Sequence, residues 1–125
     1  MAVVLIVEDQ EQVRVLAESI LQESGHRTLS AATKDEALAL IQGDGPIDLL
    51  FTDISLTQDA DAGSMQAGLE LARAAVTFRP DLRVLYTTGQ GVTDGMKALF
   101  VDGGEFLPKP YDLTQLAKKV GDMTR

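Results

Sequence analysis

The sequence predicts an α/β fold, in which a doubly wound parallel sheet of five strands carries helices on both faces. The first observation is that short apolar segments alternate five times with segments of helical periodicity. The second is that several apolar segments are continuous, which is typical of strands buried on both faces of a parallel sheet. The 125 residues have the size of one domain, 1–125, and 45% of them are hydrophobic, enough for a core.

Five short apolar segments are the expected strands. They are Val3–Val7, His26–Ala31, Asp48–Thr52, Arg83–Thr87 and Glu105–Leu107. The first, third and fourth are rich in Val, Ile, Leu and Phe, so we expect them to be buried on both faces. Parallel neighbours need right-handed crossover connections, and the helical segments between the strands supply them.

The first two helices follow from the spacing of their apolar residues. The first should end at Gly25. Its apolar face consists of Val13, Leu16, Ala17, Ile20 and Leu21. The second should begin at Thr33, because Glu36 completes the spacing of a capping box. Its apolar face consists of Ala37, Leu40 and Ile41.

Glycine, proline and capping residues delimit the other three helices. The third should span about Gly68 to Phe78 and end before Pro80. The fourth should span about Thr93 to Asp102, although it contains a glycine. The fifth should begin at Asp112, which has a glutamine three residues later. It should bury Leu113, Leu116, Ala117 and Val120.

The composition excludes several classes of partner and site. A net charge of −8 and a pI of about 4.4 disfavour direct binding to nucleic acid or to an anionic membrane. The chain has no cysteine, which excludes disulfides and thiolate metal sites. No apolar run approaches the ~18 residues of a membrane span, and the N-terminus lacks the features of a signal peptide. We therefore expect a cytoplasmic protein.

Charged and hydroxyl side chains stand at the ends of the predicted strands. In chain order they are Glu8 and Asp9, Asp53, Thr87 and Thr88, and Lys109. Ligands of open α/β sheets bind at the carboxyl ends of the strands, so we expect these side chains to converge. Two carboxylates ~4 Å apart repel by about 4 kcal/mol at an effective dielectric of 20. A cation that prefers oxygen ligands, Mg²⁺ or Mn²⁺, would offset this repulsion, and a phosphoryl group could lie between the metal and the lysine.

Four stretches of the chain resemble the receiver domain of two-component response regulators. They are VLIVEDQEQVR, DLLFTDISL, VLYTTGQ and FLPKPYDLTQL, and they cover nearly the whole chain in the family's order and approximate spacing. The resemblance is specific because an acid pair, a strand-end aspartate, a threonine before a small residue and a Lys-Pro pair occur in series. It implies a flavodoxin-like sheet with the strand order 2-1-3-4-5.

The resemblance also implies a role for each residue of the site. Asp53 would be the phosphoryl acceptor, and Lys109 would pair with Asp53 and with the phosphoryl group. Mg²⁺ or Mn²⁺ would be held by Glu8, Asp9, Asp53 and the backbone carbonyl of Ser55. Of the acid pair, Asp9 would be the more direct ligand, and Glu8 would act largely through water.

Three further features are implied by the same resemblance. Thr88 would bond a phosphoryl oxygen, since it directly precedes the small residue Gly89. Phe106, three residues before the lysine, would be the aromatic switch residue. The Lys109–Pro110 peptide bond would be cis, a geometry that only about 5–6% of X–Pro bonds adopt.

Simpler structural roles remain open for some of these residues. Asp9 could cap the first helix, because Gln12 lies at the spacing of a capping box. Thr88 could be a turn hydroxyl, and Phe106 could simply fill the core. For Asp9, the capping role and the role that the resemblance implies can coexist.

The segment Thr57–Ala67 departs from the family's pattern. It is polar, contains glycine and has no helical period, so we expect a long exposed loop. In the family, a glycine that opens the third helix follows the acceptor by eight or nine residues. Here the matching glycine, Gly68, follows Asp53 by fifteen residues, and Thr57 stands where the family often has proline.

The resemblance implies a phosphorelay switch and not an enzyme that turns over a substrate. Asp53 would receive a phosphoryl group from a phosphohistidine of a histidine kinase or a histidine phosphotransfer protein, and the domain would hydrolyse it slowly. No effector domain follows in this sequence, so we expect either that output passes through contact with a downstream protein or that the sequence is a piece of a longer chain. Two alternatives remain open: a receiver-like binding module that is not phosphorylated, and a small phosphohydrolase with an aspartyl-phosphate intermediate.

Overall fold

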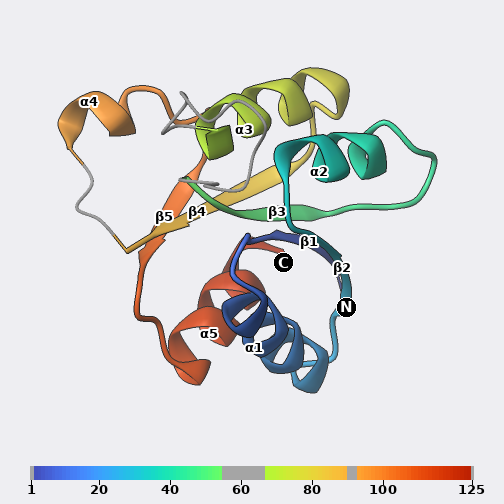
Figure 1. The fold of residues 1–125 in the computed structure, drawn as a ribbon, viewed down its shortest axis with the longest axis vertical. Coiled ribbons are helices and arrows are strands. Elements are labelled where there is room, and N and C mark those ends of the chain that lie inside the picture. The colour runs from blue at the N-terminus through green and yellow to red at the C-terminus, as the bar shows by residue number, and fades with distance from the viewer. Residues whose placement is uncertain (1, 55–66, 90–92, 125) are drawn as a thin grey trace.

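The computed structural model describes residues 2–54, 67–89 and 93–124. Within these ranges, strands and helices alternate along the chain (Figure 1). The strands are β1 Val3–Val7, β2 Arg27–Ala31, β3 Leu49–Asp53, β4 Arg83–Thr88 and β5 Glu105–Pro108. The helices are α1 Glu11–Glu23, α2 Lys34–Ile41, α3 Ala67–Phe78, α4 Asp94–Lys97 and α5 Leu113–Met123.

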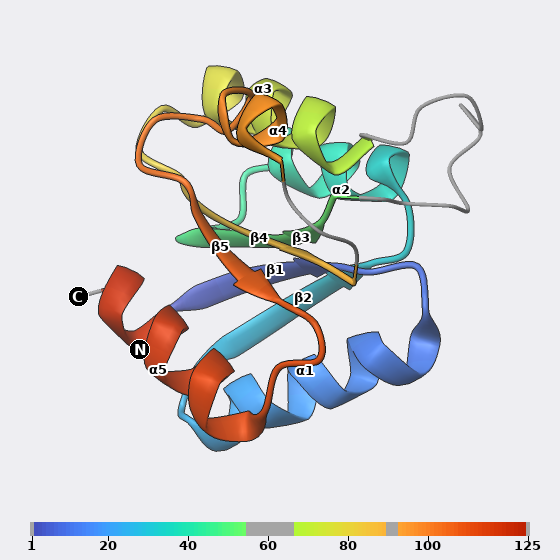
Figure 2. The same cartoon turned by 90° about the vertical axis from the view of Figure 1, so that its left-hand side faces the viewer.

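The strands form one parallel sheet in the order β2-β1-β3-β4-β5, as the sequence predicted. Figure 2 shows α1 and α5 on one face of the sheet and α2, α3 and α4 on the other. The fold is therefore doubly wound, and strand order reverses between β1 and β3. No helix among the described residues is long and apolar enough to cross a membrane.

Two apolar layers hold the helices to the sheet, one on each face. In β3, Leu49 and Phe51 point into the layer beneath α1 and α5. Leu50 and Ile54 point into the layer beneath α2 and α3. This alternation, with every residue of β3 buried, explains why the strand reads as a continuous apolar run.

The predicted starts of α2 and α5 and the predicted end of α1 are confirmed. The Thr33 hydroxyl accepts a hydrogen bond from the Glu36 N–H at 3.2 Å. The Asp112 carboxylate accepts from the Gln115 N–H at 2.7 Å, and the Gln115 side chain accepts from the Asp112 N–H at 3.0 Å. α1 is followed by Gly25 with φ of 91°, a conformation that glycine adopts without steric cost.

Two predicted core residues lie outside the core. Leu16 is 53% exposed and Leu113 is 54% exposed. Leu16 lies at the edge of the apolar stripe of α1, whose centre is formed by the buried Ala17 and Ile20. Leu113 is the first residue of α5 and lines a shallow groove between α1 and α5, so it does not reach the sheet.

The fourth helix is shorter than predicted, because the chain leaves helical geometry soon after Lys97. Thr93 caps α4, and the N–H groups of Leu99 and Phe100 bond to carbonyls three residues back, as in a tightening last turn. The next N–H, of Val101, donates to the Tyr86 hydroxyl at 3.0 Å. This bond to β4 replaces the helical bond that the sequence pattern anticipated.

Candidate functional site

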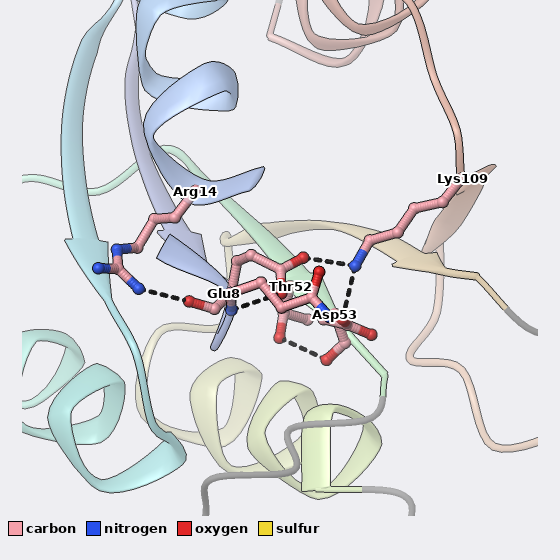
Figure 3. Close-up of polar contacts among 6 residues, drawn as sticks. Glu8, Arg14, Thr52, Asp53 and Lys109 are labelled. Carbon is pink, nitrogen blue, oxygen red and sulfur yellow. Dashed lines mark hydrogen bonds and ion pairs between the residues drawn. The ribbon is translucent and has the colours of Figure 1, made fainter. Parts of the chain in front are cut away.

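The predicted site residues meet at the carboxyl end of the sheet. Glu8 and Asp9 directly follow β1, Asp53 ends β3, and Lys109 directly follows β5. The Lys109 N–H donates to the carbonyl of Thr88 at 3.0 Å, which continues the pairing of β5 with β4. The sheet therefore holds the backbone beneath the charged groups of the site, and Figure 3 shows Glu8, Asp53 and Lys109 among them.

Three carboxylates form a buried cluster. One oxygen each of Glu8, Asp9 and Asp53 lies within 4.8 Å of the others, and each residue is at most 7% exposed. The N-cap residue of α1 is Gln10, one residue after the position that the sequence offered, and the Gln10 side chain makes no capping bond.

Lys109 bridges two members of the cluster. Its ammonium donates to Glu8 Oε1 at 2.5 Å and to Asp53 Oδ2 at 2.8 Å (Figure 3). Burial alone would lower the pKa of Lys109, but its hydrogen bonds to Asp53 and Glu8 outweigh this effect and raise the pKa. The lysine is therefore held as a fixed positive charge beside the strand-end aspartate.

The surroundings of Glu8 favour the protonated form of its carboxyl group. Burial raises its pKa from 4.5 to about 7, against the opposing effect of the Lys109 hydrogen bond, and Asp9 adds to the rise. The Gln10 N–H donates to Glu8 Oε2 at 3.1 Å, and Arg14 Nη1 donates to the Glu8 carbonyl at 2.9 Å. The direct ion pair between Glu8 and Lys109 is a contact that the sequence did not predict.

Stability of the metal-free protein should therefore depend on pH through Glu8. The pKa of Glu8 is higher in the folded state, so the folded state binds this proton more tightly than the unfolded chain. Its stabilising contribution is present below about pH 4.5 and is lost as the pH rises to about 7. We expect Glu8→Gln to remove roughly 1 to 3 kcal/mol of this pH dependence.

Chemical denaturation in a chelating buffer, at several pH values across this window, measures the difference between the wild-type protein and Glu8→Gln. Comparing the two proteins cancels the titration of groups elsewhere in the chain. Identical pH profiles for the two proteins would contradict the assignment.

The acidic cluster could hold a divalent cation. Three carboxylates face a single ammonium group, so the fully ionised cluster carries excess negative charge in a buried setting. A set of oxygen donors alone suits Mg²⁺ or Mn²⁺. The predicted carbonyl ligand, Ser55, lies outside the described residues, as do residues 57–66 of the predicted loop.

The two threonines at the end of β4 point to opposite faces of the sheet. Both are buried, each with 2% exposure. Side chains alternate along the strand, so Thr88 shares a face with Tyr86, which packs in the α2–α3 layer. Thr87 shares the opposite face with Leu85 and is the register partner of Asp53.

Gly68 is the second residue of α3, so it lies at the start of this helix, as the resemblance to the family implies. Its N–H donates to the Ile54 carbonyl at 2.9 Å. A Cβ atom on Gly68 would lie 1.9 Å from the carbonyl oxygen of Asp53 and 2.7 Å from the Cα of Ile54. Only glycine allows α3 to begin this close to the end of β3.

Aromatic residues lie on both sides of the site. Phe106 is half-buried in β5, and its ring centroid lies 6.5 Å from that of Phe100, which stacks on Tyr86 at 4.1 Å.

The predicted cis peptide bond between Lys109 and Pro110 is present. Next to it, Tyr111 packs edge-on against Phe51 at 5.6 Å, a contact that no sequence pattern indicated.

Comparison with known proteins gives one consistent family. The family model of the response regulator receiver domain matches residues 4–121. The sensor kinase CckA of Brucella abortus is 31% identical over 98% of this chain, which spans only 12% of that kinase. The response regulator receiver protein CpdR of Brucella abortus is 27% identical, covering 96% of this chain and 94% of CpdR.

A solved structure agrees with these sequence matches. The receiver domain of NtrX from Brucella abortus is 28% identical and superposes with a TM-score of 0.82, covering 97% of each chain. The fold thus has a counterpart along almost the entire chain.

Proposed function

The chain belongs to the response regulator receiver domain family, and from this membership we propose that it is a phosphorylation-dependent switch acting through Asp53. Receiver domains of two-component systems are signalling modules and not classical enzymes. The donor in our proposal is a phosphohistidine of a histidine kinase or of a histidine phosphotransfer protein. The transfer requires Mg²⁺ or Mn²⁺.

The single observation that supports this proposal best is the contact between Asp53 and Lys109 at 2.8 Å, within the acidic cluster. In the proposed transfer, an Asp53 carboxylate oxygen attacks phosphorus and a P–O bond forms. The P–N bond to the donor imidazole breaks, and the imidazole keeps the electron pair and takes up a proton. Lys109 offsets negative charge on the transferring oxygens.

The metal would be held by Glu8, Asp9 and Asp53, together with the carbonyl of Ser55. When bound, it neutralises charge on the phosphoryl oxygens. Lys109 orients Asp53 beside this position, because its ammonium lies 2.8 Å from Asp53 Oδ2.

Output in this proposal passes to a downstream protein. Thr88 bonds a phosphoryl oxygen of phosphorylated Asp53, and Phe106 changes its position, which alters the surface formed by α4 and β5. The net charge of −8 favours a protein partner over nucleic acid or an anionic membrane. We place the protein in the cytoplasm, where kinases that use ATP are found.

The test is incubation with a small-molecule phosphodonor and Mg²⁺, followed by intact-mass spectrometry and peptide mapping after borohydride reduction. We expect one added phosphoryl group, located on Asp53. Recovery of the group on serine or threonine would refute Asp53 as the acceptor. No phosphorylation with any donor would instead favour the receiver-like binding module.

Metal binding should depend on Asp9 far more than on Thr88. Asp9 contributes a carboxylate oxygen to the acidic cluster, whereas Thr88 offers only a neutral hydroxyl. We expect Asp9→Ala to weaken Mg²⁺ binding by about tenfold or more, a change of at least about 1.4 kcal/mol. Thr88→Ala should change it by less than about twofold.

Isothermal titration of both variants with Mg²⁺ measures the difference. Asp9→Ala is also expected to raise the stability of the metal-free protein, because one repelling charge is gone. Equal Mg²⁺ affinity in the wild-type protein and Asp9→Ala would rule out Asp9 as a ligand.

A further inference from the structure

We propose that the Thr87 hydroxyl donates a hydrogen bond to the carboxyl group of Asp53 during loss of the phosphoryl group and thereby shortens the lifetime of the phosphorylated state. This inference rests on the proposed function, since it concerns the same aspartate. It adds a residue that the family resemblance does not assign, because the resemblance places the phosphoryl contact on Thr88.

The first observation is that the Thr87 hydroxyl is buried and has no partner within the described ranges. Thr87 is 2% exposed, and its Oγ1 atom has no hydrogen-bond partner among the residues that the structure describes. No other buried side-chain nitrogen or oxygen in the described part of the chain shares this condition. An unpaired buried hydroxyl is costly, so each such group calls for an explanation.

The second observation is the position of Thr87 relative to the phosphoacceptor. Thr87 is paired in register with Asp53 on the neighbouring strand, and the Ile54 N–H donates to the Thr87 carbonyl at 2.9 Å. Neighbouring strands lie about 4.8 Å apart. The two side chains therefore occupy adjacent places on the same face of the sheet.

The charges on this face explain why the hydroxyl would act mainly in the phosphorylated state. Lys109 now donates to Asp53 Oδ2 at 2.8 Å. In the proposed function, this ammonium also pairs with the phosphoryl oxygens, so its interaction with the carboxyl group is shared. Staggered rotamers give the Thr87 hydroxyl a choice of orientations, and the bond that we infer uses one that faces the neighbouring strand.

The reaction that this bond would assist is hydrolysis of the acyl phosphate. A water oxygen forms a bond to phosphorus, and the bond between phosphorus and the Asp53 oxygen breaks. The electron pair of the broken bond returns to the carboxylate, and the proton lost by water passes to the released phosphate or to solvent. A donor aimed at the carboxylate stabilises the negative charge that develops there, and so accelerates the step.

The test compares Thr87→Val with Thr87→Ser. Valine keeps the shape of threonine and lacks the hydroxyl, whereas serine keeps the hydroxyl. Each protein is phosphorylated with a small-molecule donor and Mg²⁺, the donor is removed, and the loss of phosphorylated protein is followed by intact mass. We expect the half-life to lengthen by roughly tenfold in Thr87→Val and to stay within about twofold of the wild type in Thr87→Ser.

Thermal unfolding of the unphosphorylated proteins separates this role from a purely structural one. Removing an unpaired buried hydroxyl should raise the melting temperature of Thr87→Val whatever its role in hydrolysis. A raised melting temperature together with an unchanged half-life would overturn the inference and leave the proposed function intact. A wild-type protein that never carries a phosphoryl group on Asp53 would overturn both.

Discussion

Replacing Asp53 with asparagine is expected to abolish phosphorylation by any donor. The amide oxygen of asparagine carries no charge and is a poor nucleophile, while the surrounding groups remain in place. We expect the rate of phosphoryl incorporation to fall by at least about 10³-fold, which corresponds to a barrier higher by about 4 kcal/mol. Intact mass after incubation with a small-molecule donor and Mg²⁺ measures this directly.

The variant should remain folded, so the loss would be chemical. Lys109 keeps its ion pair with Glu8 at 2.5 Å, and one of three clustered carboxylates is neutralised. The free energy of unfolding should therefore be equal to or higher than that of the wild type. Asp81→Asn is a matched control, since Asp81 is exposed in the turn between α3 and β4 and should leave phosphorylation unchanged. Normal phosphorylation of Asp53→Asn would show that another residue is the acceptor.

Of the substitutions that we propose, Gly68→Ala should cause the largest fall in the free energy of unfolding. The new Cβ atom would lie 1.9 Å from the Asp53 carbonyl oxygen, and backbone atoms cannot move aside as the end of a flexible side chain can. Either α3 shifts away from β3 or the end of β3 is displaced. We expect a loss of at least about 3 kcal/mol, at the upper end of overpacking effects.

Gly121→Ala is the control for this substitution. Gly121 lies within α5, and a Cβ atom there would meet nothing within 4 Å. Alanine should therefore stabilise the helix by up to about 1 kcal/mol, the usual difference in helix propensity. Urea denaturation of both variants gives the comparison, and similar stabilities for the two would contradict the close approach of α3 to β3.

The sequence predicted the features that depend on local pattern. The buried β3 was recognisable because a strand covered on both faces has few polar positions, and α2 and α5 were recognisable from their capping residues. The convergence of Glu8, Asp9 and Asp53 followed from one rule, that the carboxyl ends of parallel strands share an edge.

What the sequence could not predict depends on distances between side chains. Glu8 and Lys109 are 101 residues apart, and nothing in either neighbourhood indicates that they touch. The exposure of Leu16 depends on how α1 is rotated against the sheet, which an apolar stripe defines only loosely. That the Thr87 hydroxyl has no hydrogen-bond partner among the described residues becomes visible only in the folded structure.

The short α4 helix affects how much free energy phosphorylation must supply to rearrange this part of the protein. α4 has four residues and none of them is buried, and the turn that follows it is tied to β4 by the bond from Val101 to Tyr86. An element with so little buried surface can change its arrangement at a small free-energy cost. A signal of a few kcal/mol is then enough to redistribute its populations almost completely. The sheet, with β3 wholly buried, would keep the same conformation in both states.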